Sequence, residues 1–347
     1  IEKLIKDGKN FSNLEKKKIK YLINSYLELI PFSIHKYDAD FLKTVSDINE
    51  EKGRITTFYF IENILKIFLG AIKNLDNLLF VPKYKEDKTL FHIPCMYQKS
   101  KCKPITNKVF LYFHGNAEDI FNATNNVGVI NATLPFNTIC MEYPGYSIYY
   151  EEKSAETIES DSLALFDFLT NECKVNNKDI VICGRSIGTG PATYLASQRK
   201  PGALILISPI KSIKDTVKNL IGPMQYLVRD RFNNYERING VTCPLLIIHG
   251  QKDSLIPYED SIKLSERTSG PYELILPENM NHNDVQIYDD FLEPITSFLK
   301  RHHMLNYKKE KVVIDHKFFE LPEYLKDKGN LSNNDMVSNL VRKLLKI

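Results

Sequence analysis

From Val109 onward, short runs of apolar residues alternate with longer segments whose apolar residues recur at helical spacing. The runs contain few polar residues, as strands buried on both faces do, and the segments between them have the length of helices. This alternation predicts an α/β fold with a doubly wound, mostly parallel sheet that is covered by helices on both sides. The predicted strands are "KVFLYFHG", "FNTICMEYPGYS", "DIVICG", "GALILISP", "PLLIIHG" and "YELILPE".

The whole chain is divided by its composition into three parts. Residues 1–80 are predicted to form an N-terminal helical extension, 81–301 the α/β domain, and 302–347 a basic C-terminal extension. Within the domain, 210–240 is longer than a simple connection and is interpreted as a short cap-like helical excursion over the site.

One segment of the N-terminal extension bears on membrane contact. "TFYFIENILKIFLGAI" at 57–72 is too short to span a bilayer and carries Glu62 and Lys66. Its amphipathic spacing allows two interpretations, packing against the protein or lying on a membrane surface. The expected location is intracellular, and the second interpretation of this segment adds peripheral contact with a membrane.

Composition narrows the function classes. The chain has 347 residues, 43% of them hydrophobic, and a net charge of +3, which does not require a nucleic-acid partner. Its six cysteines show no C-x-x-C spacing, so we expect no zinc site. We also expect no other metal and no cofactor. Buried free thiols in strand-like runs suit a reducing compartment. The pattern predicts no particular oligomeric state.

The clearest chemical signal is Gly184-Arg185-Ser186-Ile187-Gly188, between a predicted strand and a predicted helix. A serine on such a sharp turn lifts its hydroxyl clear of the sheet, and the flanking glycines prevent side-chain collisions. The N–H of Ile187 then points towards a developing oxyanion. A helix-capping serine is the alternative interpretation, but the strand–turn–helix context favours a nucleophile.

A nucleophilic serine needs a histidine and a carboxylate, and in this kind of fold the chain order is serine, then acid, then histidine. His282 lies in a polar loop after the last strand, whereas His249 ends a buried strand and is interpreted as structural. The other histidines after Ser186 lie at a helix end or in the tail. Asp253 follows a buried strand directly; Glu259 and Asp260 are rivals inside a helical pattern.

The first strong strand ends in a loop that we expect to complete the oxyanion site. Gly115 lets the backbone approach a substrate, and the N–H of Asn116, or less favourably that of Ala117, is the second predicted donor. His114 precedes the nucleophile in the chain and is interpreted as bracing this loop. Gly115, Ala117 and Arg185 are candidate substrate contacts.

Five motifs together resemble the bud-emergence-homologue branch of the α/β-hydrolases: "FHGNAEDI", "EYPGYS", "GRSIGTGPATYLAS", "HGQKDSLIP" and "NHND". The resemblance covers about residues 80–300. It implies the triad Ser186, Asp253 and His282, with Asn116 and Ile187 near the oxyanion. It also implies that Tyr143, Pro144 and Tyr146 line an acyl-side wall, and that the relatives include membrane-associated enzymes that remove palmitate from proteins.

The resulting prediction is a serine hydrolase that cleaves acyl thioesters or esters, with an acylated protein or a lipid as its partner. A palmitoyl-protein thioesterase is the first expectation, and a lysophospholipase or monoacylglycerol esterase is the alternative. A non-catalytic hydrolase-fold scaffold at a membrane is the alternative of another class, because fold alone does not fix function.

Overall fold

The computed structural model describes residues 75–85, 87–103, 106–116, 118–149, 151, 153–216, 230–306 and 310–322. The predicted helix at 57–72, residues 217–229 of the predicted excursion at 210–240 and the last part of the C-terminal extension lie outside these residues. Two compact units are distinguished by their internal contacts. The larger one comprises Val81–Gly145 and Tyr149–Asp315, and it holds every described candidate residue except Tyr146.

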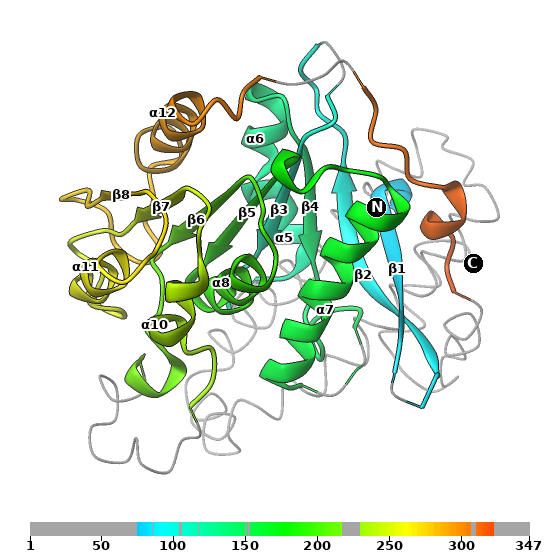
Figure 1. Ribbon diagram of the computed structural model, residues 1–347, viewed down its shortest axis with the longest axis horizontal. Helices are drawn as coiled ribbons and strands as arrows, with labels where there is room; N and C mark the ends of the chain where they lie inside the picture. Colours follow the sequence, from blue (N-terminus) through cyan, green and yellow to red (C-terminus); the bar gives the residue numbers. More distant parts are fainter. Residues whose placement is uncertain are drawn as a thin grey trace, which may run out of the picture. The chain divides into compact units, whose positions relative to one another are not determined.

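An eight-stranded sheet is the centre of the fold, in the order β1-β2-β4-β3-β5-β6-β7-β8 (Figure 1). Neighbouring strands from β4 to β8 are parallel, and β2 pairs antiparallel with β4. The mostly parallel sheet predicted from the apolar runs is confirmed. The strands are β1 (Leu78–Tyr84), β2 (Leu90–Gln98), β3 (Val109–Phe113), β4 (Asn137–Met141), β5 (Ile180–Arg185), β6 (Ala203–Ile207), β7 (Leu245–Ile248) and β8 (Tyr272–Ile275).

The order of the strands creates a switch point between β3 and β5. The chain passes from β3 to β4 on one side and then crosses back to β5 on the other, with Phe113 in register with Gly184. In open sheets of this kind, the crevice at the carboxyl ends of two such strands is where ligands bind. The loops after β3 and β5 therefore meet at the expected place for a site.

The central strands of the sheet are the most buried ones. Every residue of β3, β4, β6 and β7 is buried, whereas β8 at the edge is only partly covered. Arg185 is the single residue of β5 that is not fully buried. It stands at the carboxyl end of its strand, beside the serine.

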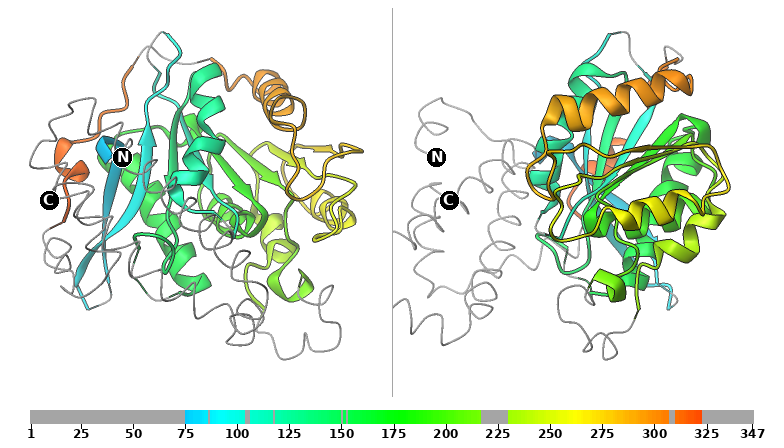
Figure 2. Two further views of the ribbon diagram at one scale, coloured as in Figure 1. Left: turned by 180° about the vertical axis from the view of Figure 1, so that it is seen from behind. Right: turned by 90° about the vertical axis from the view of Figure 1, so that its left-hand side faces the viewer.

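Helices cover both faces of the sheet (Figures 1 and 2). The helices α7, α8 and α11 lie on one face, and α5, α6 and α12 lie on the other. The short α10 packs against α8. Their bounds are α5 (Ile120–Asn126), α6 (Gly128–Thr133), α7 (Ala155–Asp167), α8 (Thr189–Gln198), α10 (Asn234–Arg237), α11 (Glu259–Ser265) and α12 (Glu293–Arg301).

Short helical turns complete the described structure. Single 3-10 turns are η1 (Leu75–Asn77), η3 (Asn177–Asp179), η4 (Ser186–Gly188), η6 (Ile238–Gly240) and η8 (His316–Phe319), and π-helical turns are η2 (Phe168–Glu172) and η7 (Ile287–Leu292). The last helical segment of the domain has two parts: η7 precedes α12, whose first turn contains Pro294. A proline is well tolerated there because the first helical N–H groups have no acceptor within the helix.

Side-chain caps fix where the helices α5 and α7 begin. Asp119 accepts hydrogen bonds from the amides of Phe121 and Asn122 and so starts α5. Ser154 caps α7 by accepting from Thr157. Such caps satisfy amides that have no partner inside the helix.

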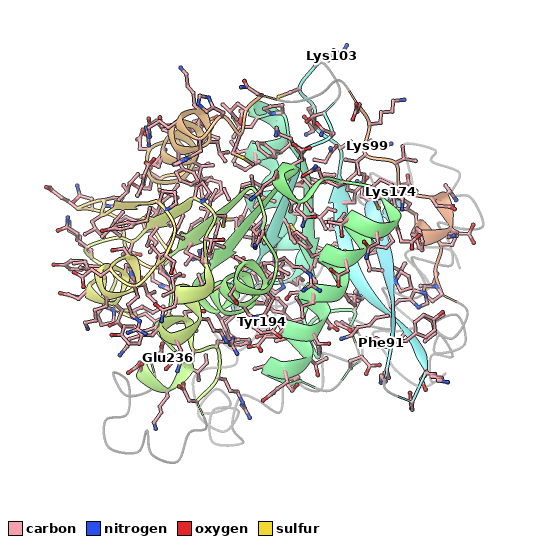
Figure 3. All side chains as sticks on the ribbon, viewed as in Figure 1. Phe91, Lys99, Lys103, Lys174, Tyr194 and Glu236 are labelled. Atoms are coloured by element: carbon pink, nitrogen blue, oxygen red, sulfur yellow. The ribbon has the colours of Figure 1, made fainter. Side chains whose placement is uncertain are left out.

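Helices α7, α8 and α10 are also joined by one arginine. The guanidinium of Arg237 on α10 binds the Glu159 carboxylate of α7, with a distance of 2.5 Å to Oε1. Its central carbon lies 4.9 Å from the ring centroid of Tyr194 on α8, which is labelled in Figure 3. These contacts tie the end of α10 to α7 and α8, and α10 lies inside the predicted excursion at 210–240.

Strands β1 and β2 were not predicted. Both contain a proline, Pro82 in β1 and Pro94 in β2, and a proline within an apolar run argues against a central strand. The structure places these two strands at one end of the sheet. Within the described residues, no helix combines the length and the apolar character needed to cross a bilayer.

Candidate active site

Ser186 stands on a sharp turn between β5 and α8. Its φ of 54° lies in the left-handed region, which a non-glycine residue adopts only when the surroundings enforce it. A Cβ atom on Gly184 would lie 2.5 Å from the carbonyl oxygen of Gly188 and 2.7 Å from Cβ of Ala192. A Cβ atom on Gly188 would lie 2.6 Å from the carbonyl oxygen of His114. The two glycines thus allow the turn to pack directly against the neighbouring strand end and helix.

Three loops bring Ser186, His282 and Asp253 into one hydrogen-bonded chain. The Nε2 atom of His282 lies 3.0 Å from Oγ of Ser186, and its Nδ1 atom lies 2.7 Å from Oδ2 of Asp253. Ser186 follows β5, Asp253 follows β7 and His282 follows β8. The three side chains were predicted separately, each from its position after a strand.

The Asp253 carboxyl is held in its ionised form. Burial alone would raise its pKa, but hydrogen bonds from His249, His282 and the amide of Ile256 hold the pKa well below its ordinary value. The other carboxylate oxygen, Oδ1, accepts the amides of Leu255 and Ile256, both at 2.9 Å. Because an ionised carboxylate can only accept, the proton of its bond to His282 belongs to Nδ1. The Nε2 atom of a neutral His282 is then an acceptor for the Ser186 hydroxyl.

The loop after β3 is braced by a buried pair. The His114 ring makes a 3.0 Å contact with Oε1 of Glu142 and a 2.9 Å contact with the carbonyl oxygen of Gly115. Burial opposes charge on His114, but the hydrogen bond and the charge of Glu142 raise its pKa above the ordinary value. The bracing role predicted for His114 agrees with these contacts.

Tyr143 belongs to the same network. Its ring stacks on that of His114 with the centroids 4.0 Å apart, and its hydroxyl donates to the His114 carbonyl over 2.8 Å. It is 2% exposed. These contacts give Tyr143 a bracing position, and its predicted part in an acyl-side wall stays a prediction. Tyr146 belongs to the smaller unit, so its part also stays a prediction.

The predicted oxyanion donors lie on the two loops that meet at the switch point. Ile187 follows Ser186 at the start of the helical turn that leads into α8. Gly115 is buried, and its amide donates to the Glu118 carboxylate over 3.2 Å. Asn116 is exposed at the turn, and Ala117 lies outside the described residues.

Arg185 connects the loops around the site. Its guanidinium binds Glu118 through Nη1, and through Nη2 it binds the main-chain carbonyl of His282, each at 2.8 Å. A longer contact of 3.3 Å reaches Oδ1 of Asn283. Arg185 was predicted as a substrate contact; its described partners are the loops that carry the candidate site.

A cavity of about 230 Å³ lies beside these residues. Its polar wall includes the Arg185–Glu118 pair and Asn283, and its remaining lining residues are mostly apolar. The full lining is Tyr112, Glu118, Asn126, Val127, Arg185, Ile207, Asn283, Val285, Ile287 and Phe291. Among the described residues, no group of histidine, cysteine or acidic side chains is arranged as metal ligands would be.

The sequence did not indicate several residues that contact the site. Glu118, Glu142 and Asn283 act through contacts between loops that are far apart in the chain, and nothing in their local spacing signals such partners. His249 was interpreted as structural because it ends a buried strand. Its position four residues before Asp253 is the one signal that could have linked it to the acid.

We compared the sequence with those of known proteins. No family model matches the chain. The α/β-hydrolase domain-containing protein 17B of Xenopus tropicalis is 30% identical over 212 residues, which are 60% of this chain and 70% of that protein. The human protein 17B is 29% identical over 214 residues, 60% of this chain and 71% of its own length. The protein aho-3 of Caenorhabditis elegans, also an α/β-hydrolase domain-containing protein, is 31% identical over 199 residues, 57% and 59% of the two chains.

Solved structures share the fold at low sequence identity. A 2,6-dihydroxy-pseudo-oxynicotine hydrolase superposes with a TM-score of 0.53 at 15% identity, covering 68% of this chain and 71% of its own. The esterase Pf2001 of Pyrococcus furiosus gives a TM-score of 0.51 at 18% identity, covering 65% and 91%. These structures establish the α/β-hydrolase fold, and the relatives establish the family. The chain therefore belongs to the family of α/β-hydrolase domain-containing proteins 17 and is an enzyme of the α/β-hydrolase class.

Proposed function

We propose that this enzyme cleaves acyl thioester or ester bonds with Ser186 as nucleophile, His282 as general base and acid, and Asp253 as the group that orients His282. The observation that carries the proposal is the continuous chain of two hydrogen bonds, 3.0 Å from Ser186 to His282 and 2.7 Å from His282 to Asp253. A serine hydroxyl is a weak nucleophile until an adjacent base takes its proton, and this arrangement supplies that base.

The reaction then runs in two halves. Ser186 Oγ attacks the acyl carbonyl carbon while Nε2 of His282 takes the hydroxyl proton, and the ionised Asp253 stabilises the imidazolium that results. His282 returns the proton to the departing thiol or alcohol as the acyl-enzyme forms. Water, deprotonated by His282, then releases the fatty acid and restores the serine.

The negative oxygen of each tetrahedral intermediate needs donors that are already in place. The N–H of Ile187, directly after the nucleophile, is the first candidate, and the N–H of Asn116 on the loop after β3 is the second. The brace of His114, Glu142 and Tyr143 supports this assignment, since it holds the loop that carries Asn116. Losing one such donor costs about 100- to 1,000-fold in rate in related sites.

For the substrate we propose a fatty thioester on a protein, as the sequence resemblance implies. The cavity beside Arg185 supports a substrate with both an apolar and a polar part, because its apolar walls meet the Arg185–Glu118 pair. Its volume of about 230 Å³ is below the roughly 300–1,000 Å³ of pockets that enclose a whole ligand of drug size. We assign it to the portion of the substrate nearest the bond that is cleaved.

A panel of acyl substrates tests this proposal. The purified chain is given an S-palmitoylated cysteine peptide, the O-palmitoylated serine peptide of the same sequence, a lysophospholipid and a monoacylglycerol, and fatty acid release is measured. We expect the palmitoyl thioester peptide to give the highest kcat/KM, and Ser186→Ala to abolish release. Turnover of the lipids but not of the peptides would overturn the protein-thioester assignment, whereas release that persists in Ser186→Ala would overturn the serine mechanism.

A further inference from the structure

Asp253 has a second histidine bound to it. Nε2 of His249 lies 3.1 Å from Oδ2 of Asp253, the same oxygen that binds His282 at 2.7 Å. His249 is fully buried at the end of β7, and the mechanism above does not use it. One carboxylate oxygen thus faces two imidazole rings.

The remaining contacts of His249 settle where its proton lies. Nε2 also lies 3.0 Å from the carbonyl oxygen of Ile256, so this nitrogen faces two groups that can only accept and must carry the proton. Nδ1 lies 2.6 Å from Oγ of Ser261, a buried hydroxyl on α11 that can donate to it. Ser261, His249, Asp253, His282 and Ser186 therefore form one continuous hydrogen-bonded chain.

The carboxylate of Asp253 accepts hydrogen bonds at all of its acceptor positions. Oδ1 accepts the amides of Leu255 and Ile256, and Oδ2 accepts the two imidazoles. A carboxylate offers about four acceptor positions, and all of them are engaged. The carboxylate has no spare position through which it could rotate away from His282.

We propose that His249 is a positioning residue for hydrolysis: it fixes Oδ2 of Asp253 towards His282 and moderates how strongly that oxygen attracts the imidazolium of His282. The proposal rests on the proposed roles of Ser186, Asp253 and His282. A carboxylate that already accepts an N–H from His249 is a weaker acceptor for a second one. Removing His249 has two consequences, a less well oriented carboxylate and a stronger attraction for the His282 proton.

The test compares His249→Leu, which removes the donor, with His249→Gln, whose side-chain amide can still donate to Asp253. We expect His249→Leu to lower kcat by about 10- to 100-fold with little change in KM, by analogy with the loss seen when the hydrogen-bond partner that orients a metal ligand is removed. In the pH dependence of kcat/KM, the acidic limb of His249→Leu should move to higher pH than that of the wild type. His249→Gln keeps the limb near its original position and recovers most of kcat.

The controls separate positioning from general stability. Charged groups near His282 are Asp253 at Nδ1 and Arg185 at its carbonyl, with Glu118 paired to Arg185, and all are retained in these variants. His316→Leu, at a histidine whose side chain is 77% exposed, should leave both parameters unchanged. Should His249→Leu not fold, Ser261→Ala removes the hydroxyl at Nδ1 and should shift the limb in the same direction by a smaller amount.

A measurement without substrate distinguishes this proposal from the proposed function. In ¹⁵N-histidine spectra of the wild type, His249 should show the Nε2–H form, and His249→Leu should shift the Nδ1–H proton of His282. The inference is wrong if His249 carries its proton on Nδ1, or if folded His249→Leu keeps both the wild-type kcat and the acidic limb. A wild type that shows the expected spectra but hydrolyses no acyl substrate would overturn the proposed function instead.

Discussion

Arg185 donates a 2.8 Å hydrogen bond from Nη2 to the main-chain carbonyl of His282, 97 residues further along the chain. Its Nη1 atom makes an equally short bond to Glu118. The planar guanidinium has several donors in a fixed fork and can bind two loops at once, which a single ammonium group cannot do with the same geometry. The residue next to the proposed nucleophile thus holds both the loop of the proposed base and the loop after β3.

Replacing the guanidinium of Arg185 should lower the rate of catalysis more than the stability of the fold. In Arg185→Lys one ammonium cannot reach both the His282 carbonyl and Glu118, so the imidazole should lose its alignment with Ser186. We expect kcat to fall on the order of 10- to 100-fold, as misplacement of about 1 Å can cause. Steady-state kinetics on an acyl thioester, with the melting temperature measured alongside, check this.

Arg301→Lys is the matched control, because Arg301 binds Glu273 in an exposed pair at the sheet edge. It should retain wild-type kcat. Wild-type kcat in Arg185→Lys would show that the loop of His282 is held by other contacts.

The tight turn at Ser186 predicts that alanine substitution will change the stability of the fold very differently at two glycines, Gly188 and Gly128. In Gly188→Ala the new methyl group would meet the carbonyl oxygen of His114 at 2.6 Å, and the main-chain oxygen of Phe113 lies closer still. Backbone atoms cannot rotate aside, so the cost should reach or exceed the roughly 1–3 kcal/mol of ordinary overpacking. Urea unfolding of Gly188→Ala gives the value.

Gly128→Ala provides the comparison, since a methyl group there has no atom within 4 Å and lies in helix α6. It should leave stability unchanged or raise it by up to about 1 kcal/mol, the usual helix preference of alanine over glycine. Equal effects of the two substitutions would refute the close approach of the turn to the end of β3.

The pair of His114 and Glu142 predicts a pH-dependent contribution to stability. The folded pKa of His114 is raised, so its stabilisation is complete below the ordinary value near 6.5 and is lost as pH rises through the folded value. Glu142→Gln removes the carboxylate, and breaking a buried pair costs up to about 3–5 kcal/mol. Unfolding free energies at about pH 6 and about pH 9 should show the larger loss at the lower pH. A loss that is independent of pH would mean that His114 is neutral in the folded protein.

The sequence predicted those parts of the molecule that depend on local pattern. The continuous apolar runs from Val109 onward became the parallel strands because burial on both faces leaves few positions for polar residues. Ser186, Asp253 and His282 could be selected because each follows one of these strands, and parallel strands end at one edge of the sheet.

What the sequence could not supply depends on contacts between distant loops. Glu142 reads as an ordinary polar residue after a strand, yet it is fully buried against His114, 28 positions earlier. The stacking of Tyr143 on that same histidine was not predicted either, because it joins two loops that are far apart in the chain. Strands β1 and β2 were missed because their prolines oppose a strand prediction, and only pairing with the rest of the sheet overrides that preference.

The most direct test of the central claim is intact-protein mass spectrometry after exposure to a fluorophosphonate, which modifies a serine only when an adjacent base has activated it. We expect one adduct per chain, located on the peptide that contains Ser186. It should be absent in Ser186→Ala and form much more slowly in His282→Gln. A folded wild-type protein that acquires no adduct, or an adduct that persists in Ser186→Ala, would contradict the proposal that Ser186 is the nucleophile activated by His282.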